Sequence, residues 1–129
     1  MHVFSVKTSA HEELLDITSR VEAAVRESGI MDGICCVYTP HTTAAITINE
    51  NADPDVRRDL LKGLRHLGLE SVSFDHAEGN SPSHVKSSLV GCSETIIVND
   101  GSLALGTWQG IYFCEFDGPR TRKVYVKII

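Results

Sequence analysis

Three histidines lie in polar segments of the sequence, where a packed apolar core would not select them. His41 opens a segment rich in hydroxyl groups, and His76 and His84 bracket a second segment rich in carboxylate, amide and hydroxyl groups. Neutral imidazole is a common ligand of transition metals, and it transfers protons near neutral pH. We therefore expect the two segments to form two halves of one small-molecule site.

A divalent metal ion is one candidate occupant of this site. His41, His76 and His84 would hold a zinc-like ion better than magnesium and leave one position open. Glu78 or Asp75 would then be a fourth ligand, would orient a ligand, or would act as general base. The spacing of His76 and His84 matches none of the common zinc signatures. The alternative, that the histidines bond only to backbone or carboxylate groups, stays equally open.

A phosphate or carboxylate group is a second candidate occupant. A helix that begins near Ser81 directs unpaired backbone N–H groups and its positive dipole end outwards. Asn80 and Ser83 add short polar side chains, and His84 falls in the first turn. The alternative is simple helix capping with nothing bound, which this segment alone favours.

A third polar segment precedes the C-terminus. Trp108 offers a flat face for stacking, and the amide of Gln109 can read the edge of a ring. Glu115 and Asp117 share one face of a predicted strand, and Arg120 suits phosphate. The alternative is a loop anchored by a partly buried tryptophan, with a carboxylate–arginine pair that stabilises a hairpin.

Composition narrows the classes of function. The chain has 129 residues, a formal net charge of -5 and 42% hydrophobic residues, which predicts one domain over residues 1–129. The negative charge argues against nucleic acid as a partner. There is no apolar run long enough for a membrane span, and no signal-peptide core is recognised, so we expect a cytoplasmic protein. The four cysteines are expected to be free thiols.

Hydrophobic periodicity predicts a single compact α+β domain with an antiparallel-rich mixed β-sheet and two or three helices. The expected strands cover residues 2–8, 14–17, 33–38, 44–50, 72–76, 94–98, 110–117 and 123–129, and the expected helices follow Ser19, Asp53 and Ser81 and end at Gly29, Gly68 and Gly91. The last two strands are expected to form a hairpin around Gly118-Pro119. In the second helix, we expect Leu64→Ala to cost roughly 2–5 kcal/mol through a cavity.

The strand over 44–50 is expected to carry part of the site. If extended structure reaches back to His41, one polar face includes His41, Thr43 and Asn49. Such a face suits the wall of a cleft, although a simple edge strand has the same pattern.

Taken together, these motifs resemble the YjbQ-like family, whose members are described as secondary thiamine-phosphate synthases. The matching segments are His41-Thr42-Thr43-Ala44-Ala45, 49–57, 78–88, Gly106-Thr107-Trp108-Gln109-Gly110-Ile111 and 115–120. They occur in order from about Gly33 to the C-terminus, whereas residues 1–32 match in outline only.

The resemblance implies an α+β subunit that forms a homotrimer, with the histidine-lined cleft near a subunit boundary. It also implies a weak transferase activity that joins a pyrimidine diphosphate to a thiazole phosphate and releases pyrophosphate. Against this reaction, magnesium–pyrophosphate sites are rich in carboxylates, whereas this site is rich in histidine. A metal-dependent hydrolase and a non-catalytic trimer that binds a metal or a phosphorylated metabolite stay open as alternatives.

The residues and motifs assign the site as follows. The expected catalytic residues are His84, Glu115 and Glu78; the expected contacts to a phosphorylated small molecule are Thr43, Asn49, Asn80, Ser83, Trp108, Gln109 and Arg120; the expected metal ligands are His41, His76 and His84.

Overall fold

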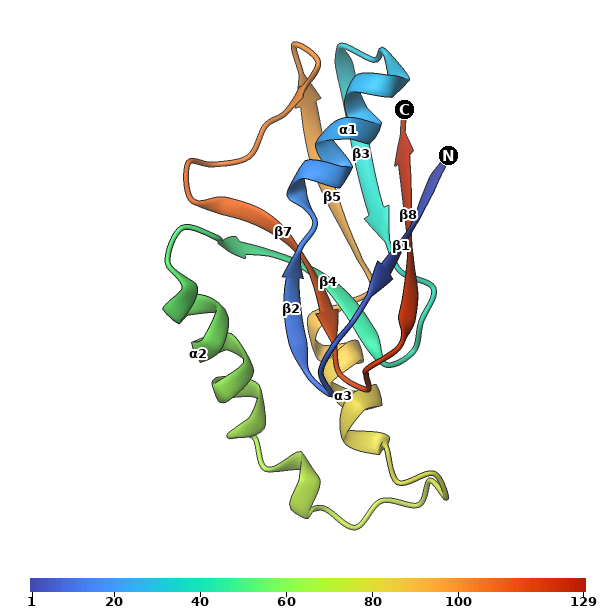
Figure 1. Cartoon of the computed structure of the whole chain (residues 1–129), viewed down its shortest axis with the longest axis vertical. Helices are drawn as coiled ribbons and strands as arrows, with labels where there is room; N and C mark the ends of the chain where they lie inside the picture. Colours follow the sequence, from blue (N-terminus) through green and yellow to red (C-terminus); the bar gives the residue numbers. More distant parts are fainter.

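Two antiparallel sheets and three helices make up the chain in the computed structural model, which describes residues 1–129 (Figure 1). The strands are β1 His2–Lys7, β2 Glu13–Asp16, β3 Asp32–Tyr38, β4 Ala44–Glu50, β5 Ser93–Asn99, β6 Ser102–Leu103, β7 Gln109–Glu115 and β8 Thr121–Ile128. The helices are α1 Thr18–Ser28, α2 Pro54–Arg65 and α3 Ser81–Val90, with a short 3-10 turn, η1, at Leu69–Ser71. The predicted single compact α+β domain is confirmed.

The strands divide between a larger sheet in the order β1-β8-β3-β5-β6 and a smaller sheet in the order β2-β7-β4. The main core contains apolar side chains of both sheets together with Val21, Ala24 and Val25 of α1. A second, smaller core lies on the other face of the β2-β7-β4 sheet, where side chains of α2 and α3 pack against Tyr112 and Cys114. β7 is therefore buried on both faces. A strand with one exposed face would instead alternate between buried and exposed residues.

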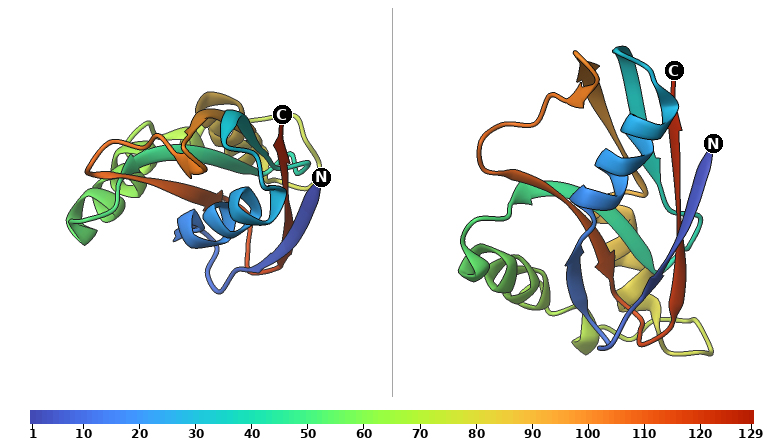
Figure 2. Two further views of the ribbon diagram at one scale, coloured as in Figure 1. Left: turned by 90° about the horizontal axis from the view of Figure 1, so that it is seen from above. Right: turned by 45° about the horizontal axis from the view of Figure 1, so that its top comes forward.

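The predicted hairpin around Gly118-Pro119 is wrong. β7 pairs with β2 and β4, whereas β8 pairs with β1 and β3, so the chain changes sheet between Glu115 and Thr121. The turn signal is real, but a turn between two strands does not make them neighbours. This change of sheet brings the end of β7 and the start of β8 to the same end of the molecule (Figures 1 and 2).

Three local predictions also differ from the structure. No strand forms over 72–76, which belongs to a long connection between η1 and α3. Ser19 lies inside α1, because Asp16 accepts hydrogen bonds from the backbone and the hydroxyl of Thr18 at the helix start. Extended structure does not reach back to His41, because residues 42–43 form a turn before β4.

α2 begins as predicted and is buried less than predicted. The Asp53 side chain accepts from the Asp55 N–H at 2.9 Å, and Pro54 is the first helical residue. The helix ends at Arg65, and none of its residues is buried. Leu67 is 56% exposed, and Figure 1 shows α2 at the side of the molecule. The apolar stripe is therefore only half covered within this chain. None of the three helices combines the length and apolarity that a membrane crossing needs.

Candidate functional site

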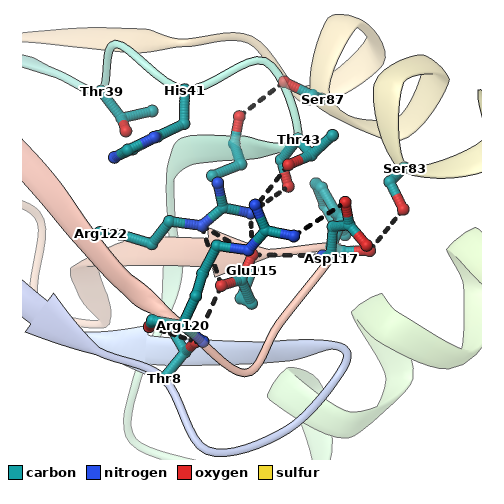
Figure 3. A network of polar contacts seen from close by, with 12 residues as sticks. Thr8, Thr39, His41, Thr43, Ser83, Ser87, Glu115, Asp117, Arg120 and Arg122 are labelled. Atoms are coloured by element: carbon teal, nitrogen blue, oxygen red, sulfur yellow. Dashed lines mark hydrogen bonds and ion pairs between the residues drawn. The ribbon is translucent and has the colours of Figure 1, made fainter. Parts of the chain in front are cut away.

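A buried ion pair lies where β7 ends and β8 begins. The Glu115 side chain is fully buried, and the Arg122 side chain is 2% exposed. The Arg122 Nε atom donates to both carboxylate oxygens of Glu115 at 2.9 and 3.1 Å, and Nη2 donates to the same carboxylate (Figure 3). Nη2 also donates to the Thr43 hydroxyl at 2.8 Å. The guanidinium is thus held at one orientation by charge-assisted hydrogen bonds.

The remaining contacts of Glu115 are also within the protein. Its Oε1 atom accepts from the Thr8 hydroxyl at 2.8 Å, and its Oε2 atom accepts from the Asp117 N–H at 3.2 Å. Glu115 therefore has no direct route to a ligand, and it orients Arg122. This placement differs from the expectation that Glu115 acts on a substrate.

Arg122 is one of the residues that line an open pocket of about 490 Å³. We call it the histidine–arginine pocket; it contains no apolar side chain apart from the edge of a proline, and its lining is Pro40, His41, Thr42, Thr43, His76, Glu78, Asn80, His84, Asp117, Arg120 and Arg122. Five separate parts of the chain meet here: the turn before β4, the connection before α3, the start of α3, the connection from β7 to β8 and the start of β8. The predicted convergence of the three histidines on one pocket is confirmed.

His41 is fixed by the backbone of β8. Its Nε2 atom accepts a hydrogen bond from the Lys123 N–H at 2.9 Å. An accepting Nε2 carries no proton, so the neutral ring carries its proton on Nδ1. Burial lowers the pKa of His41 below its usual value, and the nearby charge of Arg122 lowers it further. His41 is therefore suited to donate a hydrogen bond from Nδ1.

His76 and His84 lie edge to face, with ring centroids 5.6 Å apart. His84 is in the first turn of α3, and His76 belongs to the connection before it. The nearest carboxylate oxygen of Glu78 is 4.0 Å from His76 Nε2, and both side chains are largely exposed. No group of three or more histidine, cysteine, aspartate or glutamate side chains is arranged to hold a metal ion. A zinc-like ion therefore stays a prediction, and the donors present do not form a ready site for it.

Two polar side chains at the start of α3 have different roles: Asn80 lines the pocket, and Ser83 bonds to the end of β7. Asn80 Nδ2 donates to Asp117 Oδ2 at 2.9 Å, while Asn80 Oδ1 is buried without a partner. Arg120 Nη2 also donates to Asp117 Oδ2, at 3.2 Å. Ser83 is buried, and its hydroxyl donates to the Phe116 carbonyl at 2.6 Å. Asn80 and Arg120 thus line the pocket as expected, whereas Ser83 fastens α3 to the end of β7.

A buried lysine fastens the connection that carries His76. The Lys86 side chain is 2% exposed, and its Nζ atom donates to Glu12 at 2.8 Å and to Glu70 at 2.6 Å. Arg65 donates to the same Glu12 carboxylate at 2.9 Å. These contacts join α2, η1 and α3 to the loop before β2. They limit how far the connection between η1 and α3 can move.

Three expected contact residues lie far from this pocket. In the β4–β7 pairing, Ala44 faces Glu115 at the pocket end and Glu50 faces Gln109 at the other end. Asn49 lies six positions beyond Thr43 along the chain, which corresponds to roughly 20 Å of extended strand. Asn49 hydrogen-bonds to the Glu50 N–H, Gln109 accepts from the Gly106 N–H, and Trp108 is 62% exposed. Asn49, Trp108 and Gln109 are therefore not part of the histidine–arginine pocket within one chain.

Comparison with known proteins gives the family. The family model described as UPF0047 protein YjbQ-like matches residues 2–129. The chain belongs to the YjbQ family. The match includes residues 2–32, which the sequence motifs related to the family in outline only.

Relatives and solved structures of the YjbQ family agree with this assignment. UPF0047 protein MJ1081 of Methanocaldococcus jannaschii is 59% identical over 98% of this chain and 91% of its own length. UPF0047 protein YugU of Bacillus subtilis is 52% identical over 100% of this chain and 98% of its own length. A crystal structure of the YjbQ-family protein of Clostridium acetobutylicum has a TM-score of 0.97 at 56% identity, with both chains fully covered. A YbjQ-like protein of unknown function from Sulfolobus solfataricus has a TM-score of 0.94 at 36% identity, covering 98% and 94%.

The expected thiamine-phosphate synthase activity is wrong as a reading of this family. The relatives are named only as UPF0047 proteins, and the Sulfolobus structure is described as a protein of unknown function. Membership of the YjbQ family therefore brings a fold, but no transfer between a pyrimidine diphosphate and a thiazole phosphate.

Sequence reasoning missed the residue at the centre of the pocket of this YjbQ-family protein. Arg122 lies on the same face of β8 as Val124 and Val126, which are both buried. A charged residue in the buried register of a strand needs a partner of opposite charge. Glu115 likewise lies on the same face of β7 as the buried residues Ile111 and Phe113. Two residues of opposite charge, each on the buried face of a strand, indicate a buried ion pair, and the sequence contained this signal.

Proposed function

We propose that this protein binds phosphorylated small molecules in the histidine–arginine pocket, with the phosphate next to Arg122. The observation that carries the proposal is the state of the Arg122 guanidinium. It is almost fully buried, and five hydrogen bonds from Nε and Nη2 fix its orientation. Arg122 lines the pocket, and its Nη1 atom makes no hydrogen bond within the chain. A buried guanidinium with unused donors suits an oxyanion.

Other groups around the pocket add donors of the same kind. His41 offers the N–H of Nδ1, Thr42 and Thr43 offer hydroxyl groups, and the N-terminus of α3 faces this region. Pro82 has no N–H, and the Ser83 N–H donates to the Asn80 carbonyl, so the start of α3 stabilises a phosphate group mainly through the helix dipole.

The two carboxylates of the pocket do not remove this preference. Asp117 is occupied by Asn80 and Arg120, and the Glu78 side chain is 74% exposed and thus screened by water. His84 stands at the same pocket and is placed to exchange a proton with a bound phosphate.

Phosphate binding tests the proposal directly. Inorganic phosphate is titrated into the protein at constant pH and ionic strength, with binding measured by calorimetry and by backbone amide shifts. Arg120→Ala should weaken binding about tenfold to a hundredfold, the effect of one hydrogen bond from a charged group. Arg58→Ala removes an exposed arginine of α2 and is the matched control. Amide shifts that avoid the pocket, or equal affinities for Arg120→Ala and the wild type, would overturn the proposal.

A metal ion and catalysis stay predictions with tests of their own. Elemental analysis of protein purified without an affinity tag should give near-stoichiometric metal if the histidines hold an ion, and His84→Ala should lose it. Release of inorganic phosphate or pyrophosphate from phosphorylated compounds, lost in His84→Ala, would establish an enzyme. Ligand-induced thermal stabilisation without turnover would establish a binding protein.

The homotrimer and the cytoplasmic location also stay predictions. Half-exposed α2, together with exposed Leu67, Val72 and Phe74, supports a further copy that covers this side. Sedimentation of the purified protein measures the number of copies, and fractionation of cells measures the location.

A further inference from the structure

A second cavity adjoins the histidine–arginine pocket. Its volume is about 520 Å³, and it shares the residues Pro40, His41, Thr42 and His84 with that pocket. We call the remainder of this cavity the neutral lobe; it is lined by Tyr38, Thr39, Ser87, Ser88, Gly91 and Cys92. The imidazoles of His41 and His84 therefore stand at the junction of two compartments.

The two compartments differ in charge. The histidine–arginine pocket contains two arginines and two carboxylates, whereas the neutral lobe contains no arginine, lysine or carboxylate. The hydroxyl groups of Thr39 and Ser87 are already bonded to backbone carbonyls, at 3.1 and 2.6 Å. An anionic group placed in the neutral lobe would thus lose water without gaining a partner.

The neutral lobe has a wall suited to a flat group. Tyr38 is 38% exposed, and its ring is held by Tyr125, with ring centroids 6.0 Å apart. The ring face of a fixed tyrosine provides contact area for a ligand ring at little cost in conformational entropy. The last turns of α3 also line the neutral lobe, and Ser88 is exposed there.

From this arrangement we infer that the ligand is a phosphate monoester whose organic part is an uncharged ring that occupies the neutral lobe. The inference rests on the proposed function, because the phosphate of this ester is the group beside Arg122. The ester linkage then lies between His41 and His84, and the ring lies between Tyr38 and α3. A cavity of this size accommodates one ring, since small-molecule sites occupy about 300–1,000 Å³.

Three probes separate the two compartments. Inorganic phosphate fills only the first, phenyl phosphate adds an uncharged ring, and phosphoglycolate adds an organic part with a negative charge. Phenyl phosphate should bind about tenfold more tightly than inorganic phosphate, the gain from covering part of one ring. Phosphoglycolate should bind no more tightly than inorganic phosphate, because the neutral lobe offers its carboxylate no arginine or lysine.

One variant closes the neutral lobe and leaves the other compartment open. Ser88→Trp should abolish the tenfold gain of phenyl phosphate and leave the affinity for inorganic phosphate within about twofold. Leu89→Trp is the matched control, because Leu89 is exposed on the same helix and lines neither compartment. Tyr38→Ala should weaken phenyl phosphate alone.

Thiol labelling gives a second readout that does not depend on affinity. In a Cys36→Ser background, Cys92 is the exposed thiol, and burial raises the pKa of Cys35 to about 11 and that of Cys114 to about 12. Alkylation of Cys92 by N-ethylmaleimide should slow in the presence of phenyl phosphate and not in the presence of inorganic phosphate.

The outcomes distinguish the inference from the proposed function. If inorganic phosphate binds but phenyl phosphate binds no better, or if Ser88→Trp changes neither, the neutral lobe is not a binding site and the proposed function stands. If phosphoglycolate binds as tightly as phenyl phosphate, the organic part is not restricted to uncharged rings and the inference fails. If none of the three probes binds, the proposed function fails and the inference fails with it.

Discussion

Replacement of Glu115 by glutamine removes one charge from an ion pair that water does not reach. The change keeps the size of the side chain but leaves the Arg122 guanidinium buried without a counter-charge. Breaking a buried pair on one side costs about 3–5 kcal/mol, because the remaining charge is uncompensated. We therefore expect Glu115→Gln to lose about this amount of unfolding free energy, a large part of the 5–15 kcal/mol that is typical of a domain.

The contacts of Glu115 support a value in that range. Its carboxylate accepts from Arg122 Nε, from Arg122 Nη2, from the Thr8 hydroxyl and from the Asp117 N–H. A glutamine amide presents one oxygen in place of two and turns two N–H donors towards groups that are themselves donors. Several hydrogen bonds are therefore lost together with the charge.

Urea denaturation measures this loss, and thermal unfolding should show a midpoint lower by roughly 10–20 °C. Glu78→Gln is the matched control, because that side chain is 74% exposed and should change the unfolding free energy by about 0.5 kcal/mol or less. The double variant Glu115→Gln, Arg122→Met removes both charges and should recover much of the loss.

One result would refute this reasoning. If Glu115→Gln unfolds within about 1 kcal/mol of the wild type and yet loses phosphate binding, Glu115 acts on the ligand itself. The carboxylate would then belong to the binding machinery, as the sequence first suggested, and the ion pair would contribute little to the fold.

Three further predictions follow from other parts of the structure. His41 should appear in nitrogen NMR spectra as the neutral ring protonated on Nδ1, with a pKa below 6.5; because its folded pKa is lowered, the stability it contributes is present above pH 6.5 and is lost as the pH falls. The hydrogen bond from Lys86 lowers the pKa of Glu70 below 4.5, so the contact stabilises the fold above pH 4.5 and weakens as acid protonates the carboxylate; Glu70→Gln should flatten this part of the pH–stability curve. Leu64→Ala should cost about 1 kcal/mol rather than the 2–5 kcal/mol of a core leucine, because no residue of α2 is buried; a larger loss by urea denaturation would show that another copy covers this helix in solution.

Local signals gave the start of α2 and the ends of α1 and α3, but not the start of α1 or the end of α2, which falls at Arg65 and not at Gly68. Asp53 followed by Pro54 marks the start of α2, because one side chain satisfies the free N–H groups and the proline needs none. Gly29 ends α1 with φ at 69°, a conformation that glycine adopts without strain. Such signals act within a few residues, so the sequence alone contains them in full.

The pairing of strands is different, because the partner of a strand lies far along the chain. The Gly118-Pro119 segment has the composition of a hairpin turn, yet the strands on its two sides belong to different sheets. The 72–76 segment has the composition of a strand, yet no neighbour is present to complete its hydrogen bonds. Both errors arise because a strand is stabilised by its neighbours and not by its own sequence.

The sequence by itself determined the fold class, the family and the three histidines that line one pocket. Only the tertiary structure decided that Glu115 is buried beneath Arg122, and that Asn49 and Trp108 lie at the opposite end of β4 and β7. The physical reason is that the type of a residue indicates its chemistry, whereas the distance between its side chain and other groups depends on strand register and on packing between sheets. Those two quantities are fixed only when the whole chain has folded.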